Sequence, residues 1–265
     1  VLPLKRWRPA WFSGLGLVLG TLAPDLAFVL TLDRDGSPLS HSVPGLFLVA
    51  VPLVVVLHAL ATALVLPWLL PHLPGGAPLH LHALARSRPA TDARSLFRVA
   101  LSGLVGAATH VFLDGFTHGN HSGWALALIP ALATPVPQPW GTQPLHDAFQ
   151  VWLTVLLGVL ALAEWDRTAR ALPLAGPGAQ AAWEVRPAPL AACRRVVALL
   201  LGAALFGALA APVLTGALGS PDALKLSVYG SITFSAAAAL AGAVADRLRR
   251  AFETARPAVS GTLRA

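Results

Sequence analysis

The sequence predicts an all-α, polytopic membrane protein with about six transmembrane helices and both termini in the cytoplasm. Composition is the first observation behind this fold class: 55% of the 265 residues are hydrophobic and only 12% are charged, which is unusual for a water-soluble domain. The second is that apolar runs of about 20 residues, enough for a helix to cross roughly 30 Å of hydrocarbon, recur along the chain. The third is a two-sided distribution of Lys and Arg.

The predicted spans cover residues 9–32, 44–70, 95–117, 145–165, 196–218 and 226–248. The first is polar for its length and is broken by TLAPD, so we expect a short or interrupted span there. The segment IPALATPVPQPWGTQP, between the third and fourth spans, contains no Lys or Arg and could dip back into the membrane. Residues 1–171 are predicted to form a membrane domain, 172–192 a cytoplasmic linker, and 193–265 a C-terminal helix pair with a basic tail.

The basic residues set the predicted orientation. All 19 Lys and Arg residues except Arg34 and Lys225 fall on one side of the predicted spans. Because cytoplasmic loops accumulate these residues, that side is predicted to be cytoplasmic, and the protein is expected to be a multi-pass membrane protein. The net charge of +7 then indicates orientation and contact with anionic lipid, not nucleic-acid binding.

One apolar stretch, THVFLDGFTHGNH at residues 109–121, is rich in ionisable groups. His110, Asp114 and His118 are spaced four residues apart, so they share one helix face while the helix lasts. An imidazole nitrogen and a carboxylate oxygen both bind a divalent cation at about 2.0–2.2 Å, so His-x-x-x-Asp predicts half of a metal site. A charged Asp in the bilayer costs at least about 2.5 kcal/mol and normally signals a partner or an aqueous cavity. Asp25 is a second such carboxylate at similar predicted depth, and His41 lies in the first predicted outer loop.

Several of these residues allow a simpler interpretation. Asp25, after Pro24, could lie in a helix-breaking turn and cap a following helix. Asp114 could accept a hydrogen bond from His110 in a network without metal. A haem between His58 and His110 is a third possibility. Residues expected to play no part in a site are His58, which would bond a carbonyl or a neighbouring helix, His121 and His146 as loop residues, and Glu164 and Asp166 as surface charges.

Three motifs carry a resemblance to a known family. LGTLAPDLAFVL, SHSVPGLFLVAVPL and LSGLVGAATHVFLDGFTHGNHSGW resemble, in order and spacing, the bacterial membrane family called domain of unknown function 4184, over roughly residues 1–165. They are more distantly similar to the LexA-regulated inner-membrane metal-dependent hydrolase family, in which Pro-Asp, Thr-His-Ser and His-x-x-x-Asp elements recur. The resemblance implies a location in a bacterial inner membrane and these site residues: Asp25, His41, His110, Asp114 and His118. Relatives usually carry a Phe-x-x-Ser-His-Pro-Ala segment ahead of VLPL, whose His we expect to lie beside Asp25.

The function expected from these residues is metal-dependent hydrolysis of an ester or phosphoester in a lipid or lipid-linked substrate at the outer face of the membrane. The expected metal is Zn²⁺, which lowers the pKa of bound water to about 7. We expect His41, His110 and Asp114 as ligands, Asp25 as ligand or general base, and His118 as ligand or leaving-group acid. The alternative is a non-enzymatic membrane protein, with a buried polar network or an ion or proton path.

Overall fold

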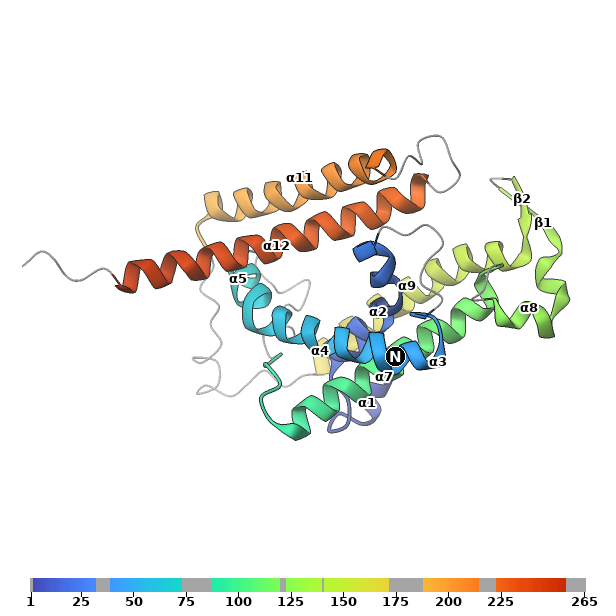
Figure 1. The fold of residues 1–265 in the computed structure, drawn as a ribbon, viewed down its shortest axis with the longest axis horizontal. Helices are drawn as coiled ribbons and strands as arrows, with labels where there is room; N and C mark the ends of the chain where they lie inside the picture. Colours follow the sequence, from blue (N-terminus) through green and yellow to red (C-terminus); the bar gives the residue numbers. More distant parts are fainter. Residues whose placement is uncertain are drawn as a thin grey trace, which may run out of the picture. The chain divides into compact units, whose positions relative to one another are not determined.

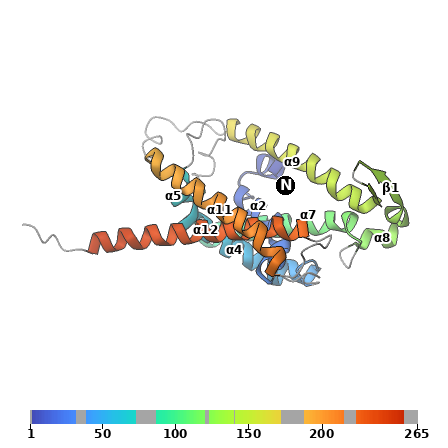
Figure 2. The same ribbon diagram turned by 90° about the horizontal axis from the view of Figure 1, so that it is seen from above.

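The computed structural model describes residues 2–31, 39–72, 87–119, 123–139, 141–171, 188–214 and 223–255 (Figures 1 and 2). It is mostly helical, which confirms the predicted α class. Four described helices are long and apolar enough to cross a membrane, Val43–His72, Ala93–Thr117, Leu145–Glu164 and Leu190–Ala211, and Gly14–Leu26 is a shorter apolar helix. Six spans and the orientation of the termini stay predictions.

Contacts divide the chain into two compact units. The first comprises Val1–Ala59 and Ala77–Gln180, and the second Leu60–Gly76 and Ala181–Ala265. The second long helix therefore contributes its first part to one unit and its last part to the other. The two units are described separately below.

The first unit begins with a short helix, α1 (Leu2–Trp7), a turn, and α2 (Gly14–Thr31). The first apolar helix thus starts later than predicted, and it continues through Pro24 without the predicted interruption. Asp25 is therefore inside a helix, and its predicted role as the cap of a following helix is wrong. Pro24 is fully buried, so packing outweighs its tendency to break a helix.

The second long helix is continuous but not uniform. Its segments are α3 (Val43–Gly45), η1 (Leu46–Ala50), α4 (Val51–Leu60), η2 (Ala61–Val65), α5 (Leu66–Leu69) and η3 (Leu70–His72). Both η1 and η2 are π-helical turns. The helix starts where Ser42 Oγ accepts a hydrogen bond of 3.2 Å from Gly45 N, an N-cap that satisfies one free donor of the first turn.

A seam of small residues joins α2 to α7 (Ala93–Thr117). A Cβ on Gly20 would lie 2.5 Å from the Gly103 carbonyl oxygen, and one on Gly106 would lie 2.5 Å from the Leu17 carbonyl oxygen. Helix backbones approach this closely only where side chains are missing. The seam therefore fixes the separation and register of the two helices.

The register shows the direction of each helix. Ser102 Oγ accepts a hydrogen bond of 2.8 Å from Ser13 N, and farther along the chain Asp25 lies beside His110, so α2 and α7 run parallel. The second long helix runs the other way, because its His58 Nε2 lies 3.5 Å from Ser13 Oγ. The end of α2, the start of the second long helix and the end of α7 consequently meet.

The remainder of the first unit follows α7. It contains α8 (Trp124–Leu128), η4 (Pro130–Ala133), the antiparallel strands β1 (Pro135–Gln138) and β2 (Gly141–Pro144), and α9 (Leu145–Ala171). The Pro-rich segment forms this hairpin, which the sequence did not predict. Glu164 on α9 is buried and lies 3.4 Å from Arg6 Nη1, so its predicted role as a surface charge is wrong.

The second unit is an antiparallel helix pair, α11 (Leu190–Leu214) and α12 (Ala223–Ala255), which lie side by side in Figure 1. Trp68 packs against Ala239 and Ala243 of α12. The last predicted span covers residues 226–248, and α12 extends beyond it to Ala255. The tail beyond it lies outside the described residues.

Candidate metal centre

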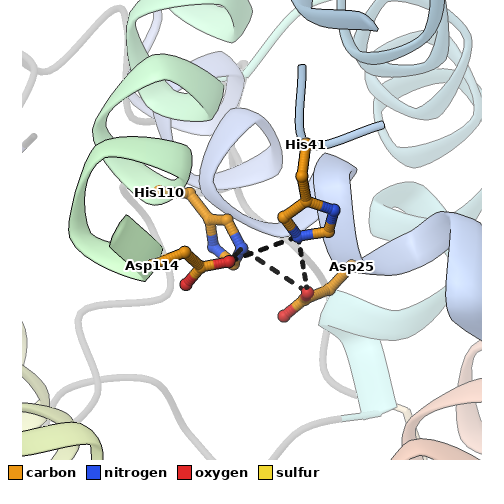
Figure 3. A group of neighbouring side chains, drawn as sticks. All are labelled: Asp25, His41, His110 and Asp114. Carbon is orange, nitrogen blue, oxygen red and sulfur yellow. Dashed lines mark ion pairs between the residues drawn. The ribbon is translucent and has the colours of Figure 1, made fainter. Parts of the chain in front are cut away.

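Four side chains meet where the three helices of the first unit converge (Figure 3): Asp25, His41, His110 and Asp114, which we call the His/Asp tetrad. Asp25 comes from α2, His41 from the turn before α3, and the other two from α7. One ligand atom of each lies within 4.8 Å of all the others. The sequence predicted all four residues as parts of one site, and the structure brings them together.

The contact distances suit a shared cation. Asp114 Oδ2 lies 3.2 Å from His41 Nε2 and 3.1 Å from His110 Nε2, and Asp25 Oδ1 lies 3.5 Å from each of the same nitrogens. Ligand atoms that share a tetrahedral zinc ion through bonds of about 2.0–2.2 Å are separated by roughly 3.3–3.6 Å. In the structure all pairs of ligand atoms lie within 4.8 Å, and a separation of 4.8 Å is larger than that between two ligands of one zinc ion. The side chains therefore have to move closer together to bind an ion.

Local structure explains the position of each member. His110 and Asp114 face the same way because they are one helical turn apart, as their spacing predicted. Asp25 joins them because α2 and α7 are parallel and in register. The turn that carries His41 is held tightly, since a Cβ on Gly45 would collide with the Leu39 carbonyl. The backbone thus delivers His41 to the ends of the other two helices.

Hydrogen bonding does not fully account for the tetrad. Among the described residues, His110 Nε2 is buried and has no hydrogen-bond partner, although two carboxylate oxygens lie within ion-pair distance of it. Buried polar atoms normally have a partner, and an exception calls for an explanation such as an ion. A cation placed between the four ligand atoms would satisfy this nitrogen. The donor set of two imidazoles and two carboxylates suits zinc and similar divalent metals.

Burial distinguishes the two carboxylates. The Asp25 side chain is 36% exposed, whereas that of Asp114 is 13% exposed and that of His41 only 3%. The Asp25 edge is therefore the open side of the tetrad. Burial alone would lower the pKa of His41, but the Asp114 and Asp25 carboxylates raise that pKa above its ordinary value. Protons and cations consequently compete for the same group.

A serine and a glutamine extend the tetrad. Ser40 Oγ lies 3.0 Å from His41 Nδ1 and is buried, so it can fix the ring and direct Nε2 towards the carboxylates.

His118 stands outside the tetrad: α7 ends at Thr117, and His118 Nδ1 lies 3.6 Å from Asp114 Oδ1. Gln150 Nε2 lies 3.4 Å from His118 Nε2. Sequence reasoning gave no role to Ser40 or Gln150. Adjacency to His41 could have pointed to Ser40, but no local signal points to Gln150.

For two other histidines the structure tests the prediction, confirming one and contradicting the other. His58 is buried beside Ser13, a neighbour of α2, as predicted. His146 was predicted to be a loop residue, but it is buried at the start of α9, with Nδ1 3.0 Å from the Leu132 carbonyl oxygen. His121 lies outside the described residues.

Comparison with known proteins identifies the family. No curated protein and no solved structure matches the chain. The more distant resemblance to metal-dependent hydrolases therefore stays a prediction. The profile of the family described as "Domain of unknown function (DUF4184)" matches residues 1–246, well beyond the part on which the resemblance rested. The helix pair of the second unit lies almost wholly within this match, and the chain belongs to the DUF4184 family.

Proposed function

We propose that the His/Asp tetrad binds a divalent cation, zinc in the first instance, and that the protein uses it to hydrolyse an ester or phosphoester of a membrane lipid or lipid-linked substrate. One observation carries the proposal: two imidazole nitrogens and two carboxylate oxygens, from three separate segments, face one another at 3.1–3.5 Å. In an apolar helical environment such a set is costly unless a function retains it.

The two carboxylates have different proposed roles. A divalent ion supplies Lewis acidity and lowers the pKa of a water molecule from 15.7 to about 7. Catalytic zinc sites commonly use three protein ligands and keep one position open. Asp114 is the closer carboxylate to both imidazoles and the more buried, so it completes a ligand set with His41 and His110. Asp25 is farther from them and more exposed, and it accepts the proton of the attacking water.

His118 has a complementary role in the proposal. It adjoins the tetrad through Asp114 and is held from the other side by Gln150. We assign to His118 the protonation of the leaving oxygen when the ester bond breaks. One proton then passes from water to Asp25 and another from His118 to the departing alcohol, so the reaction consumes one water and yields an acid and an alcohol.

Aromatic side chains near the tetrad favour a substrate at the membrane surface. Phe112, Phe116 and Trp124 form a ring cluster with centroid separations of 5.1–5.6 Å, at the same end of α7 as Asp114. Phe112 and Trp124 are largely exposed. Aromatic residues concentrate at the boundary between hydrocarbon and headgroups, which is where an ester of a lipid lies. A site at this level reaches such a bond without extracting the lipid.

Elemental analysis of the detergent-purified protein tests the metal site. We expect about one zinc or similar ion per chain in the wild type, and loss of that ion in His110→Ala/Asp114→Ala, because the variant removes two of four ligands. The matched control is His146→Ala/Asp147→Asn, which removes another His and Asp whose Nε2 and Oδ1 are 3.3 Å apart. Equal metal content in all three proteins would refute the site.

Hydrolysis needs a second measurement. Proteins loaded with the metal are assayed on lipid esters and phosphoesters in mixed micelles, with the two double variants as before. Turnover by the wild type and the control, but not by the ligand variant, supports the hydrolase. Metal binding without turnover on any such substrate would instead favour a non-enzymatic metal protein. A metal-free wild type would favour the buried polar network, in which His41 Nε2 lies 3.2 Å from Asp114 Oδ2, short enough for a hydrogen bond.

A further inference from the structure

Two cations meet at the other end of the α2–α7 pair. Lys5 Nζ donates hydrogen bonds of 2.8 Å to the carbonyl oxygens of both Pro9 and Phe12, in the turn between α1 and α2. Arg98 Nη2 donates to the same two oxygens, at 3.2 and 3.5 Å. We call Lys5 and Arg98 the basic pair. Two side chains of like charge therefore converge on one turn from helices far apart in the sequence.

The basic pair lacks a counter-ion in the part of the chain that the structure describes. No carboxylate there lies within ion-pair distance of Lys5 or Arg98. Neighbouring cations are different: Arg6 pairs with Glu164 at 3.4 Å, and the Arg8 guanidinium lies 4.7 Å from the centre of the Trp7 ring. Lys5 and Arg98 thus converge on one turn with neither a carboxylate nor an aromatic ring recorded beside them among the described residues.

The turn does not require both cations. Lys5 alone reaches both carbonyl oxygens at 2.8 Å, and the Arg98 contacts to them are longer. Arg98 Nε is buried and has no hydrogen-bond partner among the described residues. Burial, and to a lesser extent the charge of Arg98, lower the pKa of Lys5. A pair of side chains that served only to hold the turn would not need a second, repelling cation or an unused N–H donor. A bound anion would offset the repulsion and accept a hydrogen bond from the donor.

We propose that Lys5 and Arg98 form a binding site for a phosphate group. Arginine and lysine are the usual phosphate-binding side chains, and each keeps N–H groups that the turn does not use. Trp7 and Trp11, which flank the turn, are 69% and 59% exposed, as expected for side chains at headgroup level. Twelve residues of α7 separate Arg98 from His110, about 18 Å along the helix, so this site is separate from the His/Asp tetrad.

Native mass spectrometry of the delipidated full chain in detergent tests the site, with phosphatidylglycerol as the anionic probe. We expect Lys5→Gln/Arg98→Gln to weaken phosphatidylglycerol binding by about tenfold or more. The matched control, Arg8→Gln/Arg94→Gln, removes the same net charge from α7 and from the residue that follows α1, and should change binding less than about twofold. The charge-preserving Lys5→Arg/Arg98→Lys should retain most of the binding, which separates loss of charge from loss of fold.

Inorganic phosphate identifies the source of the group. If millimolar phosphate displaces phosphatidylglycerol from the wild type, the site takes free phosphate as well as a headgroup. If it does not, and phosphatidylglycerol still binds, the phosphate belongs to a lipid. Equal loss in both Gln double variants would mean diffuse attraction and would overturn the proposal, as would unchanged binding in both. None of these outcomes depends on whether the tetrad holds a metal.

Discussion

The two ends of the α2–α7 helix pair differ in the charged groups that they bring together. At one end, two imidazoles face two carboxylates, and one buried nitrogen, His110 Nε2, has no hydrogen-bond partner among the described residues. At the other, two cations share backbone carbonyls, and one buried nitrogen, Arg98 Nε, likewise has none in the part of the chain that the structure describes. The first arrangement favours a cation as the proposed ligand, and the second favours an anion. In both proposals the groups that already pair with one another indicate the charge of the ligand.

Widening the seam between the helices should disturb both ends at once. Gly106→Leu forces a side chain against the Leu17 carbonyl, so we expect loss of metal and of phosphatidylglycerol binding, together with an unfolding temperature lower by roughly 10 °C. The control is Gly158→Leu, because no atom lies within 4 Å of a Cβ at that position. Differential scanning fluorimetry, elemental analysis and native mass spectrometry provide the three readouts. If both variants keep both ligands, the seam does not set the geometry.

Neutralising Asp25 should separate chemistry from metal binding at the first end. Asp25→Asn removes the proposed proton acceptor but none of the three closer ligands, so lipid-ester turnover should fall by roughly 10²–10³. Metal affinity should change less than about tenfold, since two imidazoles and Asp114 remain. Zinc titration and turnover of the metal-loaded protein measure the two effects. A loss of metal as complete as in His110→Ala would make Asp25 a ligand of equal rank.

Removing the Ser40 hydroxyl should weaken the first end without touching a ligand. Ser40→Ala leaves His41 Nδ1 without the contact at 3.0 Å, and loss of such a supporting group costs about 10–100-fold in metal affinity. The comparison variant is Thr109→Val, since the Thr109 hydroxyl bonds only its own helix, at the Val105 carbonyl. Competition with a chromophoric zinc chelator measures both. Equal affinities for the two variants would show that His41 needs no such support.

The smallest expected effect concerns the second end. Glu164→Gln releases Arg6 from its ion pair, so a phosphate at the basic pair gains a nearby free cation, and phosphatidylglycerol affinity should rise about threefold. Asp246→Asn releases Arg250 from its ion pair, while Arg249 keeps Glu253 at 3.2 Å; this change lies in the second unit and should leave that affinity unchanged. A fall in affinity on Glu164→Gln would mean that the buried carboxylate organises the basic end instead of competing with a ligand.

Much of the candidate site could be predicted from local sequence periodicity. The four-residue spacing of His110 and Asp114 placed both on one face. Helix rise and the Lys and Arg count placed Asp25 near the outer end of its span and His41 in the adjoining outer loop. Those inferences need only one helix at a time, and the tetrad confirms the convergence. The roles of ligand, base and acid stay predictions.

The missed features all depend on contacts between distant segments. The sequence predicted a short or interrupted first span. The apolar helix Gly14–Leu26 is short, but it is not interrupted at Pro24, because propensity cannot register that this residue is fully buried. It placed Glu164 on the surface because the partner, Arg6, is 158 positions away. The basic pair was hidden for the same reason: Lys5 and Arg98 were counted as two orientation signals, and nothing local shows that they reach the same carbonyl oxygens.

Because it contains π turns, the second long helix would pack differently if a residue were deleted from it. Its buried residues Leu46, Ala50, Val54 and His58 recur in steps of four, a longer repeat than the 3.6 residues of an α-helix. The π turns η1 and η2 contain more residues per turn than an α-helix, so they absorb part of the difference between the two repeats. Deleting one residue from η2 would rotate everything downstream by about 100°, and Trp68 would leave its place against Ala239. A single-residue gap in this segment would therefore exchange the packing partners of the rest of the helix, so relatives that keep the same core should keep the same count of residues there.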